Sequence, residues 1–326
     1  MNLLSKESPF VSVVFSFRNE EEVIPELIKR LRDVFEGELK ENRIKGHELI
    51  FVNDDSTDHS LELLLEQDKG YGDIKVINMS RTFGVSVCVM AGLKYSKGDV
   101  VLYMDADLQD PPELIPALIE EWRKDDVDVV YTTRRTRKGE HPFKLWLTRL
   151  GYRILKTVSN IDIPANSGDF KLISRRAVNE LIRLHEKKPF TRGLISWIGF
   201  KQRQVFYDRD PRYAGETKFP IYSWKVISNF LDSALISFSD VPLKLALLSG
   251  FVISSSAFLF LIWVFIQKFL GLALPGWSAL AAIILVLGGI QLITIGVLGL
   301  YINSIFNETK KRPNYIVKDT YGFNDP

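Results

Sequence analysis

Short apolar runs alternate with amphipathic segments through the first 133 residues. Five runs have the length and composition of β-strands, and helical spacing of apolar residues follows most of them. The predicted strands are 11–17, 48–53, 74–78, 100–104 and 127–133, and the predicted helices begin at Glu21, Ser56, Val85 and Pro111. Each strand is apolar almost throughout, so both faces of the sheet must be covered. This pattern is typical of a mostly parallel sheet between two layers of helices.

The pattern changes at Lys244, after which two long uncharged runs are separated only by Lys268. Glycine and proline residues within 271–276 break the second run. Since about 20 apolar residues cross the hydrocarbon core of a bilayer, we expect two membrane helices, at 245–267 and 279–303. A pair of helices buried in a soluble protein is the alternative.

Basic residues flank this apolar region on one side of the expected membrane. Lys244 precedes it and Lys310, Lys311 and Arg312 follow it, whereas Lys268 alone lies in the turn. The positive-inside rule then places both termini in the cytoplasm. The N-terminal stretch lacks the apolar run of a signal peptide, which agrees with a cytoplasmic N-terminal domain.

These patterns divide the chain into four expected parts. They are a cytosolic domain at 1–220, an amphipathic juxtamembrane helix at 221–240, the two membrane helices within 241–306, and a cytosolic tail at 307–326. A further amphipathic stretch, 143–156, mixes aromatic, leucine and basic side chains. That stretch either lies in the lipid headgroup layer or packs against the cytosolic domain, whereas the headgroup layer is preferred for the juxtamembrane helix.

Composition excludes several classes of protein. The 326 residues include 42 Lys and Arg against 40 Asp and Glu, and a net charge of +2 gives no field for gripping nucleic acid. The single cysteine, Cys88, excludes an internal disulfide framework and a cysteine-rich zinc site. No G-x-G-x-x-G motif follows a strand and no P-loop motif occurs, which argues against a Rossmann dehydrogenase and a P-loop NTPase.

Acidic residues follow several of the predicted strands. Glu20 comes after the first strand, Asp54 and Asp55 after the second, and Asp105 and Asp107 after the fourth. In parallel sheets ligands bind at the carboxyl ends of the strands. The alternate carboxylates of Asp105 and Asp107 are hard oxygen ligands that suit Mg²⁺ or Mn²⁺. A solvated acidic turn is the alternative for such a pair taken alone.

Three stretches at these strand ends, 12–20, 52–58 and 103–113, resemble the family 2 glycosyltransferases. The third stretch contains Asp-Ala-Asp-Leu-Gln-Asp-Pro-Pro-Glu. Together with 212–218 and a two-span C-terminus, it resembles the polyprenyl-phosphate glycosyltransferases, which include dolichol-phosphate mannose synthases and bactoprenol glucosyltransferases. The two-span tail is most similar to the bactoprenol group. The resemblance implies an α/β, Rossmann-like A-type glycosyltransferase fold followed by a transmembrane hairpin.

The resemblance also implies roles for residues at the strand ends. The donor-binding candidates are Phe17, Arg18, Glu20, Asp54, Asp55, Ser80, Arg81 and Arg134. The metal candidates, for Mg²⁺ or Mn²⁺, are Asp105, Asp107 and Gln109, and the catalytic candidates are Asp105, Asp107 and Asp169. Arg135 and Arg137 are either donor-side groups or solvated loop charges. Asp169 either orients the acceptor or sugar, or forms a turn after Gly168.

The implied activity is inverting transfer of a sugar, with glucose preferred, from a UDP-sugar to polyprenyl (undecaprenyl) phosphate in the bilayer. Because the acceptor oxygen is already anionic, the enzyme needs basic residues to hold it more than a strong general base. The acceptor-phosphate candidates are Arg149, Arg153, Arg212 and Lys218.

Two alternatives remain for the function. One is the same reaction with GDP-mannose or another nucleotide sugar, and the other is a nonenzymatic, membrane-anchored sensor of nucleotide sugars or a scaffold. A processive polysaccharide synthase is not supported, because the Q-x-x-R-W signature is absent. Glycines within 287–291 and 296–299 would allow close helix contacts in a homo-oligomer.

Overall fold

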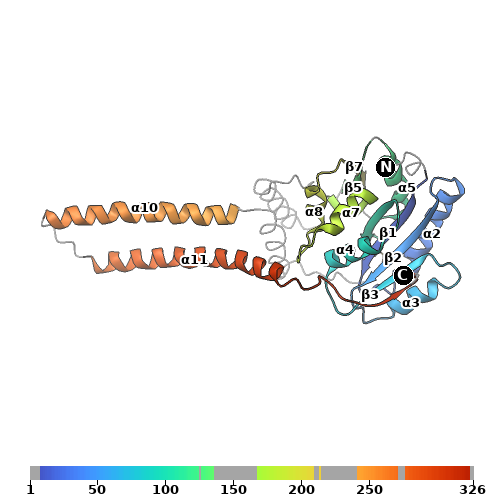
Figure 1. Ribbon diagram of the computed structural model, residues 1–326, viewed down its shortest axis with the longest axis horizontal. Coiled ribbons are helices and arrows are strands. Elements are labelled where there is room, and N and C mark those ends of the chain that lie inside the picture. The colour runs from blue at the N-terminus through green and yellow to red at the C-terminus, as the bar shows by residue number, and fades with distance from the viewer. Residues whose placement is uncertain are drawn as a thin grey trace. The chain divides into compact units, whose positions relative to one another are not determined.

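The computed structural model describes residues 8–124, 126–135, 167–208, 213, 241–270 and 276–323. These residues belong to two compact units (Figure 1). The first unit contains an eight-stranded sheet with its helices, and the second contains two long helices. The amphipathic stretches expected at 143–156 and 221–240 lie outside the described residues.

The sheet is mixed, with the strand order β7-β5-β6-β4-β1-β2-β3-β8. Strands β6 and β8 run antiparallel to their neighbours, and the other six strands share one direction. The strands are β1 (Phe10–Phe17), β2 (Gly46–Asn53), β3 (Ile74–Met79), β4 (Val100–Asp105), β5 (Val129–Arg134), β6 (Ser167–Ser174), β7 (Gln202–Tyr207) and β8 (Val317–Tyr321). The five strands expected from the sequence are present. The expected parallel arrangement holds for them, but β6 inserts between β4 and β5 in the opposite direction.

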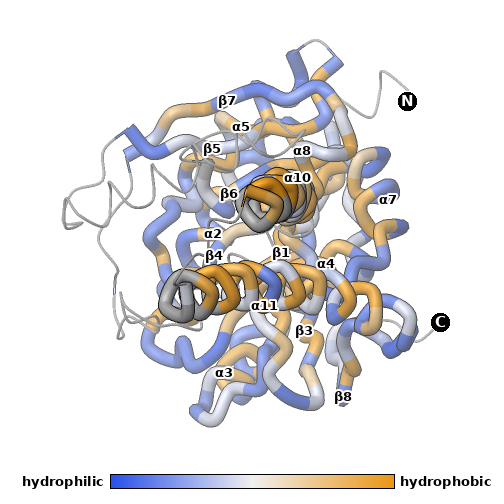
Figure 2. The backbone as a smooth tube through the Cα atoms, turned by 90° about the vertical axis from the view of Figure 1, so that its left-hand side faces the viewer, coloured by the Kyte–Doolittle hydropathy of each residue, from blue (hydrophilic) through white to orange (hydrophobic). Residues whose placement is uncertain are grey.

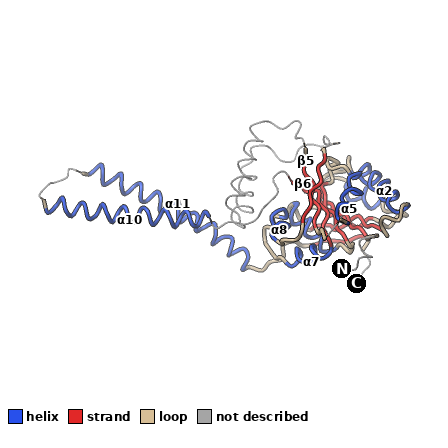
Figure 3. Tube along the Cα trace, turned by 90° about the horizontal axis from the view of Figure 1, so that it is seen from above, coloured by secondary structure: helices blue, strands red, loops and turns tan. Residues whose placement is uncertain are grey.

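Helices cover both faces of the sheet, as its apolar strands require (Figure 3). On one face lie α2 (Ile24–Lys40) and α5 (Ile115–Arg123), which follows the short 3₁₀ turn η1 (Pro112–Leu114). The buried residues of α2 recur at helical spacing and include Ile24, Leu27, Ile28, Leu31 and Phe35. In the same core Phe15 and Phe51 stack with ring centroids 4.7 Å apart. Helix α3 (Ser60–Gln67) packs beside α2.

The opposite face is covered by α4 (Val85–Tyr95) and α7 (Arg175–Arg183), with α8 (Thr191–Trp197) following in the chain. Helix α4 approaches β1 closely, because a Cβ atom at Gly92 would lie 2.2 Å from Cγ1 of Val14. Any larger residue there would push the helix away from the sheet. The close packing fixes the start of α4 beside the carboxyl ends of β1 and β2.

The second unit consists of α10 (Val241–Phe269) and α11 (Trp277–Thr309), which run antiparallel and contact each other (Figure 1). Apolar residues line both helices (Figure 2), and many are exposed, such as Leu247 at 75% and Leu292 at 71%. Among the described residues one segment, Val286–Thr309, has the length and hydropathy of a membrane span. The apolar segment of α10, Ala246–Phe260, is shorter, so the expected second span stays a prediction.

Part of the expected cytosolic tail belongs to the sheet. Strand β8 pairs antiparallel with β3, and the backbone N–H of Ser80 donates to the carbonyl of Ile316 at 3.0 Å. The side-chain amide of Asn314 donates to the carbonyl of Glu186 at 2.6 Å. The chain after α11 therefore contributes β8, an edge strand, to the sheet.

Candidate active site

The sequence-predicted residues gather at one edge of the sheet, where the carboxyl ends of β1 to β5 meet. Asp169 joins them from the other direction, because β6 runs antiparallel and begins at this edge. The structure therefore places the candidates from the first five strands and Asp169 along one edge. The acceptor candidates Arg149, Arg153, Arg212 and Lys218, together with Arg137, lie outside the described residues and remain predictions.

The acidic loop, residues 105–110, begins with the last residue of β4 and alternates between partly exposed and buried residues. The first, third and fifth residues of the loop are partly exposed, whereas the second, fourth and sixth are buried. The exposed set is Asp105, Asp107 and Gln109, and the buried set is Ala106, Leu108 and Asp110. Leu108 adopts a left-handed conformation with φ 57°, and Oδ1 of Asp107 accepts a hydrogen bond from the backbone N–H of Gln109 at 3.1 Å. The loop thus exposes the three side chains expected to hold a metal ion.

Asp110 anchors the acidic loop through a buried hydrogen bond. Its side chain is fully buried and accepts a hydrogen bond from the hydroxyl of Tyr207 on β7. That hydroxyl accepts a hydrogen bond from Nε of Arg134 at 3.4 Å. Burial and the Asp110 carboxylate raise the pKa of Tyr207, so the hydroxyl keeps its proton and remains a donor. Tyr207 was not among the sequence candidates, and it links the acidic loop to Arg134 at the end of β5.

The loops after β1 and β2 are tied together by side chains. The backbone N–H of Thr57 donates to Oδ1 of Asn19 at 2.8 Å, and the backbone N–H of Glu20 donates to the hydroxyl of Ser60 at 2.9 Å. Beside them a cavity is lined by Asn19, Glu20, Glu21, Glu22, Val23 and Asp58. Phe17 and Glu20 are buried, whereas Arg18, Asp55, Ser80 and Arg81 are exposed. These loops form the β1 to β3 side of the edge, where the donor candidates lie.

Asp54 holds the beginning of α4. Its two carboxylate oxygens accept hydrogen bonds from the backbone N–H groups of Phe83 at 2.6 Å and Gly84 at 2.9 Å. Gly84 has φ 97°, a conformation that favours glycine. Asp54 therefore positions the loop that carries Arg81, and a direct role for Asp54 in donor binding remains a prediction.

Replacing Asp54 by alanine is expected to lower the free energy of unfolding by about 2 kcal/mol, because two backbone donors at a helix start lose their acceptor. Thermal unfolding of the purified protein in detergent measures the change. The matched control is Asp33→Ala on the exposed side of α2. An equal loss of stability in both variants would contradict the capping role.

Asp169 forms a two-pronged ion pair with Arg192 of α8. Nε of Arg192 donates to Oδ1 of Asp169 at 2.8 Å, and Nη2 donates to Oδ2. The side chains of Asp169 and Arg192 are 31% and 25% exposed, so the pair opens onto the edge. Burial alone would raise the pKa of Asp169, but Arg192 outweighs it and lowers the pKa to about 2. Both Gly168 and Asp169 lie within β6, so Asp169 is not a turn residue.

The family model named glycosyl transferase family 2 matches residues 12–182. The chain belongs to this family. It is 45% identical over 95% of its length to the glycosyltransferase YkcC of Bacillus subtilis, 94% of which is covered. It is 38% identical to a prophage bactoprenol glucosyl transferase homolog of Escherichia coli K12, covering 94% of this chain and 98% of that one. The bactoprenol glucosyl transferase of Shigella phage SfX is 37% identical with the same coverage.

The solved structures that resemble this chain share less sequence identity with it than these relatives do. The mannosyltransferase PcManGT from Pyrobaculum calidifontis, in complex with GDP-Man and Mn²⁺, aligns with a TM-score of 0.41 and 15% identity. The alignment covers 61% of this chain and 55% of that chain. Family membership therefore rests on the sequence comparisons.

Proposed function

We propose that this family 2 glycosyltransferase transfers a sugar from a nucleotide diphosphate donor to a polyprenyl phosphate in the membrane, with UDP-glucose as the preferred donor. The observation that carries the proposal is the acidic loop after β4, which exposes Asp105, Asp107 and Gln109 and buries the residues between them. The near full-length similarity to bactoprenol glucosyl transferases supports a lipid-linked acceptor.

The exposed residues of this loop fit a divalent cation. All three offer oxygen atoms, and such donors suit Mg²⁺ or Mn²⁺. Among the described residues no three His, Cys, Asp or Glu side chains come together as a metal-binding group, so the protein would supply only two carboxylates and one amide here. Two carboxylates and an amide leave room for water and for phosphate oxygens of the donor. When bound, the cation would act as a Lewis acid that stabilises negative charge on the departing nucleotide diphosphate.

Other residues along the same edge are proposed to bind the nucleoside and to supply positive charge near the donor. The nucleoside is assigned to the β1 to β3 side, next to Phe17, Arg18 and Glu20. Arg134 supplies positive charge on the other side of the acidic loop, with its guanidinium held by Tyr207. Arg81, after β3, is the second basic donor candidate.

Asp169 serves as an ionised orienting group rather than as a general base. A carboxylate with a pKa of about 2 is too weak a base to take a proton near neutral pH. The proposed acceptor needs no such base, because its phosphate oxygen is already anionic. Direct attack of that oxygen on the anomeric carbon would invert the configuration and give a β-linked sugar phosphate from a UDP-α-sugar.

The helices of the second unit fit an enzyme whose acceptor stays in the bilayer. We infer that α10 and α11 both cross the membrane and that both termini are cytoplasmic, as the basic residues after α11 indicate. The segment Val286–Thr309 supports one of these spans. A tethered enzyme would keep its catalytic edge near the acceptor headgroups.

Transfer of labelled sugar into the organic phase tests the proposal. Purified protein in detergent or vesicles is incubated with undecaprenyl phosphate, Mg²⁺ or Mn²⁺, and radiolabelled UDP-glucose, with GDP-mannose and other UDP-sugars as a donor panel. We expect label in the organic phase with UDP-glucose, and none without the lipid phosphate. Donor binding without transfer from any donor would overturn the enzymatic proposal and support a sensor.

A further inference from the structure

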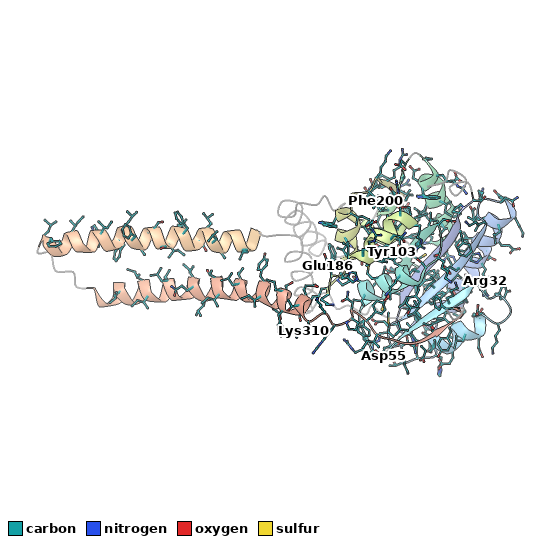
Figure 4. The ribbon with its side chains drawn as sticks, viewed as in Figure 1. Arg32, Asp55, Tyr103, Glu186, Phe200 and Lys310 are labelled. Carbon is teal, nitrogen blue, oxygen red and sulfur yellow. The ribbon has the colours of Figure 1, made fainter. Side chains whose placement is uncertain are left out.

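A second polar group lies just inside the catalytic edge, on the face of the sheet covered by α4 and α7. Lys171 of β6 is directly opposite Tyr103 of β4 and Tyr131 of β5 in the strand register. Lys171 and Tyr103, which is labelled in Figure 4, are each 2% exposed. Asp105 lies two residues after Tyr103 on β4, and Asp169 lies two residues before Lys171 on the antiparallel β6. The group is therefore adjacent to the proposed reaction centre.

Lys171 and Tyr103 have polar atoms that the described part of the chain does not satisfy. Among the described residues the Tyr103 hydroxyl is buried without a hydrogen-bond partner. The Lys171 side chain is buried as a whole, and its ammonium makes no hydrogen bond with the described residues. Burial of a charged group is costly unless it is paired. Burial and the nearby Arg192 lower the pKa of Lys171 to about 7. A lysine at this position costs stability, which calls for a functional reason.

Three cations lie close to Asp169. Arg192, which forms the ion pair, Lys171 and Arg134 all act electrostatically on the Asp169 carboxylate. Tyr103 lies in the field of Asp169, Arg192 and Asp105, and its buried hydroxyl is a donor without an acceptor among the described residues. The positive charges of Lys171 and Arg192, together with the Tyr103 hydroxyl as a hydrogen-bond donor, are the groups that an anion-binding site requires.

The strand order indicates which anion this is. Along the edge, β3, β2 and β1 come first, β4 with the acidic loop comes next, and β6 with Asp169 and Lys171 follows. If the nucleoside lies over β1 to β3 and its diphosphate at β4, the space at β6 lies beyond the diphosphate. The sugar and the incoming acceptor must occupy that space, because they approach from the side opposite the leaving group.

We propose that Lys171 and Arg192, with the Tyr103 hydroxyl, bind the phosphate of the polyprenyl phosphate acceptor. Asp169 is then a positioning residue that fixes the guanidinium of Arg192. This inference rests on the proposed function and adds an acceptor-phosphate site within the described sheet to the basic candidates outside it. The phosphate oxygens would accept hydrogen bonds from the Lys171 ammonium and the Tyr103 hydroxyl, and their negative charge would be attracted by Lys171 and Arg192.

Steady-state kinetics with the full-length protein test this site. Lys171→Met is expected to raise the KM for undecaprenyl phosphate at least tenfold, while the KM for UDP-glucose changes less than twofold. Arg192→Lys, which keeps the charge but loses the paired geometry, is expected to raise the acceptor KM less than Arg192→Ala does. The matched control is Lys201→Met, which removes the same charge from an exposed lysine before β7, at the opposite edge of the sheet.

The outcomes separate this inference from the proposed function. Turnover by the wild type with an unchanged acceptor KM in Lys171→Met would overturn the Lys171 assignment alone. A raised KM for UDP-glucose instead would assign the cations to the donor diphosphate and also overturn the inference. If the wild type shows no transfer, the proposed function fails, and binding of farnesyl phosphate by calorimetry becomes the readout. Loss of that binding in Lys171→Met would still support the anion site, and equal binding in both proteins would overturn it.

Discussion

Asp105→Ala and Asp107→Ala are each expected to reduce kcat for sugar transfer by about a thousandfold or more. Each variant removes one of the two carboxylates that the acidic loop exposes, and electrostatic stabilisation of the leaving diphosphate is worth factors of this size. The measurement is label transfer into the organic phase at saturating donor, acceptor and metal ion.

The folded state of both variants is expected to persist, because each side chain is partly exposed and outside the core. Asp33→Ala, on the exposed side of α2, is the matched control and should retain full activity. Calorimetric titration with UDP and Mn²⁺ should show weaker binding to the two loop variants only. Near wild-type turnover in either purified variant would remove the acidic loop from the reaction.

Lys171→Met is expected to make the protein more stable while impairing acceptor use. The folded protein holds this lysine at a pKa of about 7, compared with 10.5 for an ordinary lysine. Below pH 7 the folded state pays the full cost of the buried charge, so the variant gains on the order of 5 kcal/mol there. As pH rises from 7 to 10.5, the folded lysine is neutral and the unfolded lysine loses its own proton. The gain therefore shrinks and disappears near pH 10.5.

Thermal unfolding in detergent between pH 6 and 10 measures this effect, and Lys75→Met is the control. Lys75 of β3 also lies within the sheet, but its ammonium contacts Oε2 of Glu48 at 2.5 Å. Removing the Lys75 ammonium leaves the buried Glu48 carboxylate without its ion-pair partner and should lower the Tm. Among the described residues, Tyr103 and Tyr131 lie next to Lys171 in the strand register, and Arg192 and Asp169 act on it electrostatically, so these groups also affect its pH dependence. A fall in Tm for Lys171→Met at pH 6, similar to that of Lys75→Met, would show that Lys171 is a structural residue.

The inner strands of the sheet could be predicted because burial on both faces demands apolar residues throughout. Strand β6 follows a different rule, since Asp169 and Lys171 alternate with Phe170 and Leu172. Strand β8 is short and mostly exposed, and it forms only because the edge of β3 is available. Such strands depend on a partner that is distant in sequence, and local patterns do not report that partner.

The same distinction applies to the candidate site. Residues that directly follow apolar strands, such as Asp105 and Asp107, could be found because the end of a strand fixes their place. Arg192 and Tyr207 could not, because their contacts with Asp169 and Asp110 depend on β6 lying between β4 and β5. Lys171 offered one signal, as a charged residue within the run Phe170-Lys-Leu-Ile-Ser174.

The pairing of β8 with β3 means that the sheet is completed only after the chain has passed through α10 and α11. During synthesis the backbone hydrogen-bonding groups on the outer side of β3 stay unpaired until the ribosome has released β8. A shortened protein that stops at residue 240 would keep that side bare, and an unprotected strand invites association between copies. Solubility of a protein shortened to residues 1–240 therefore depends on supplying the segment that contains β8, either fused or as a separate peptide.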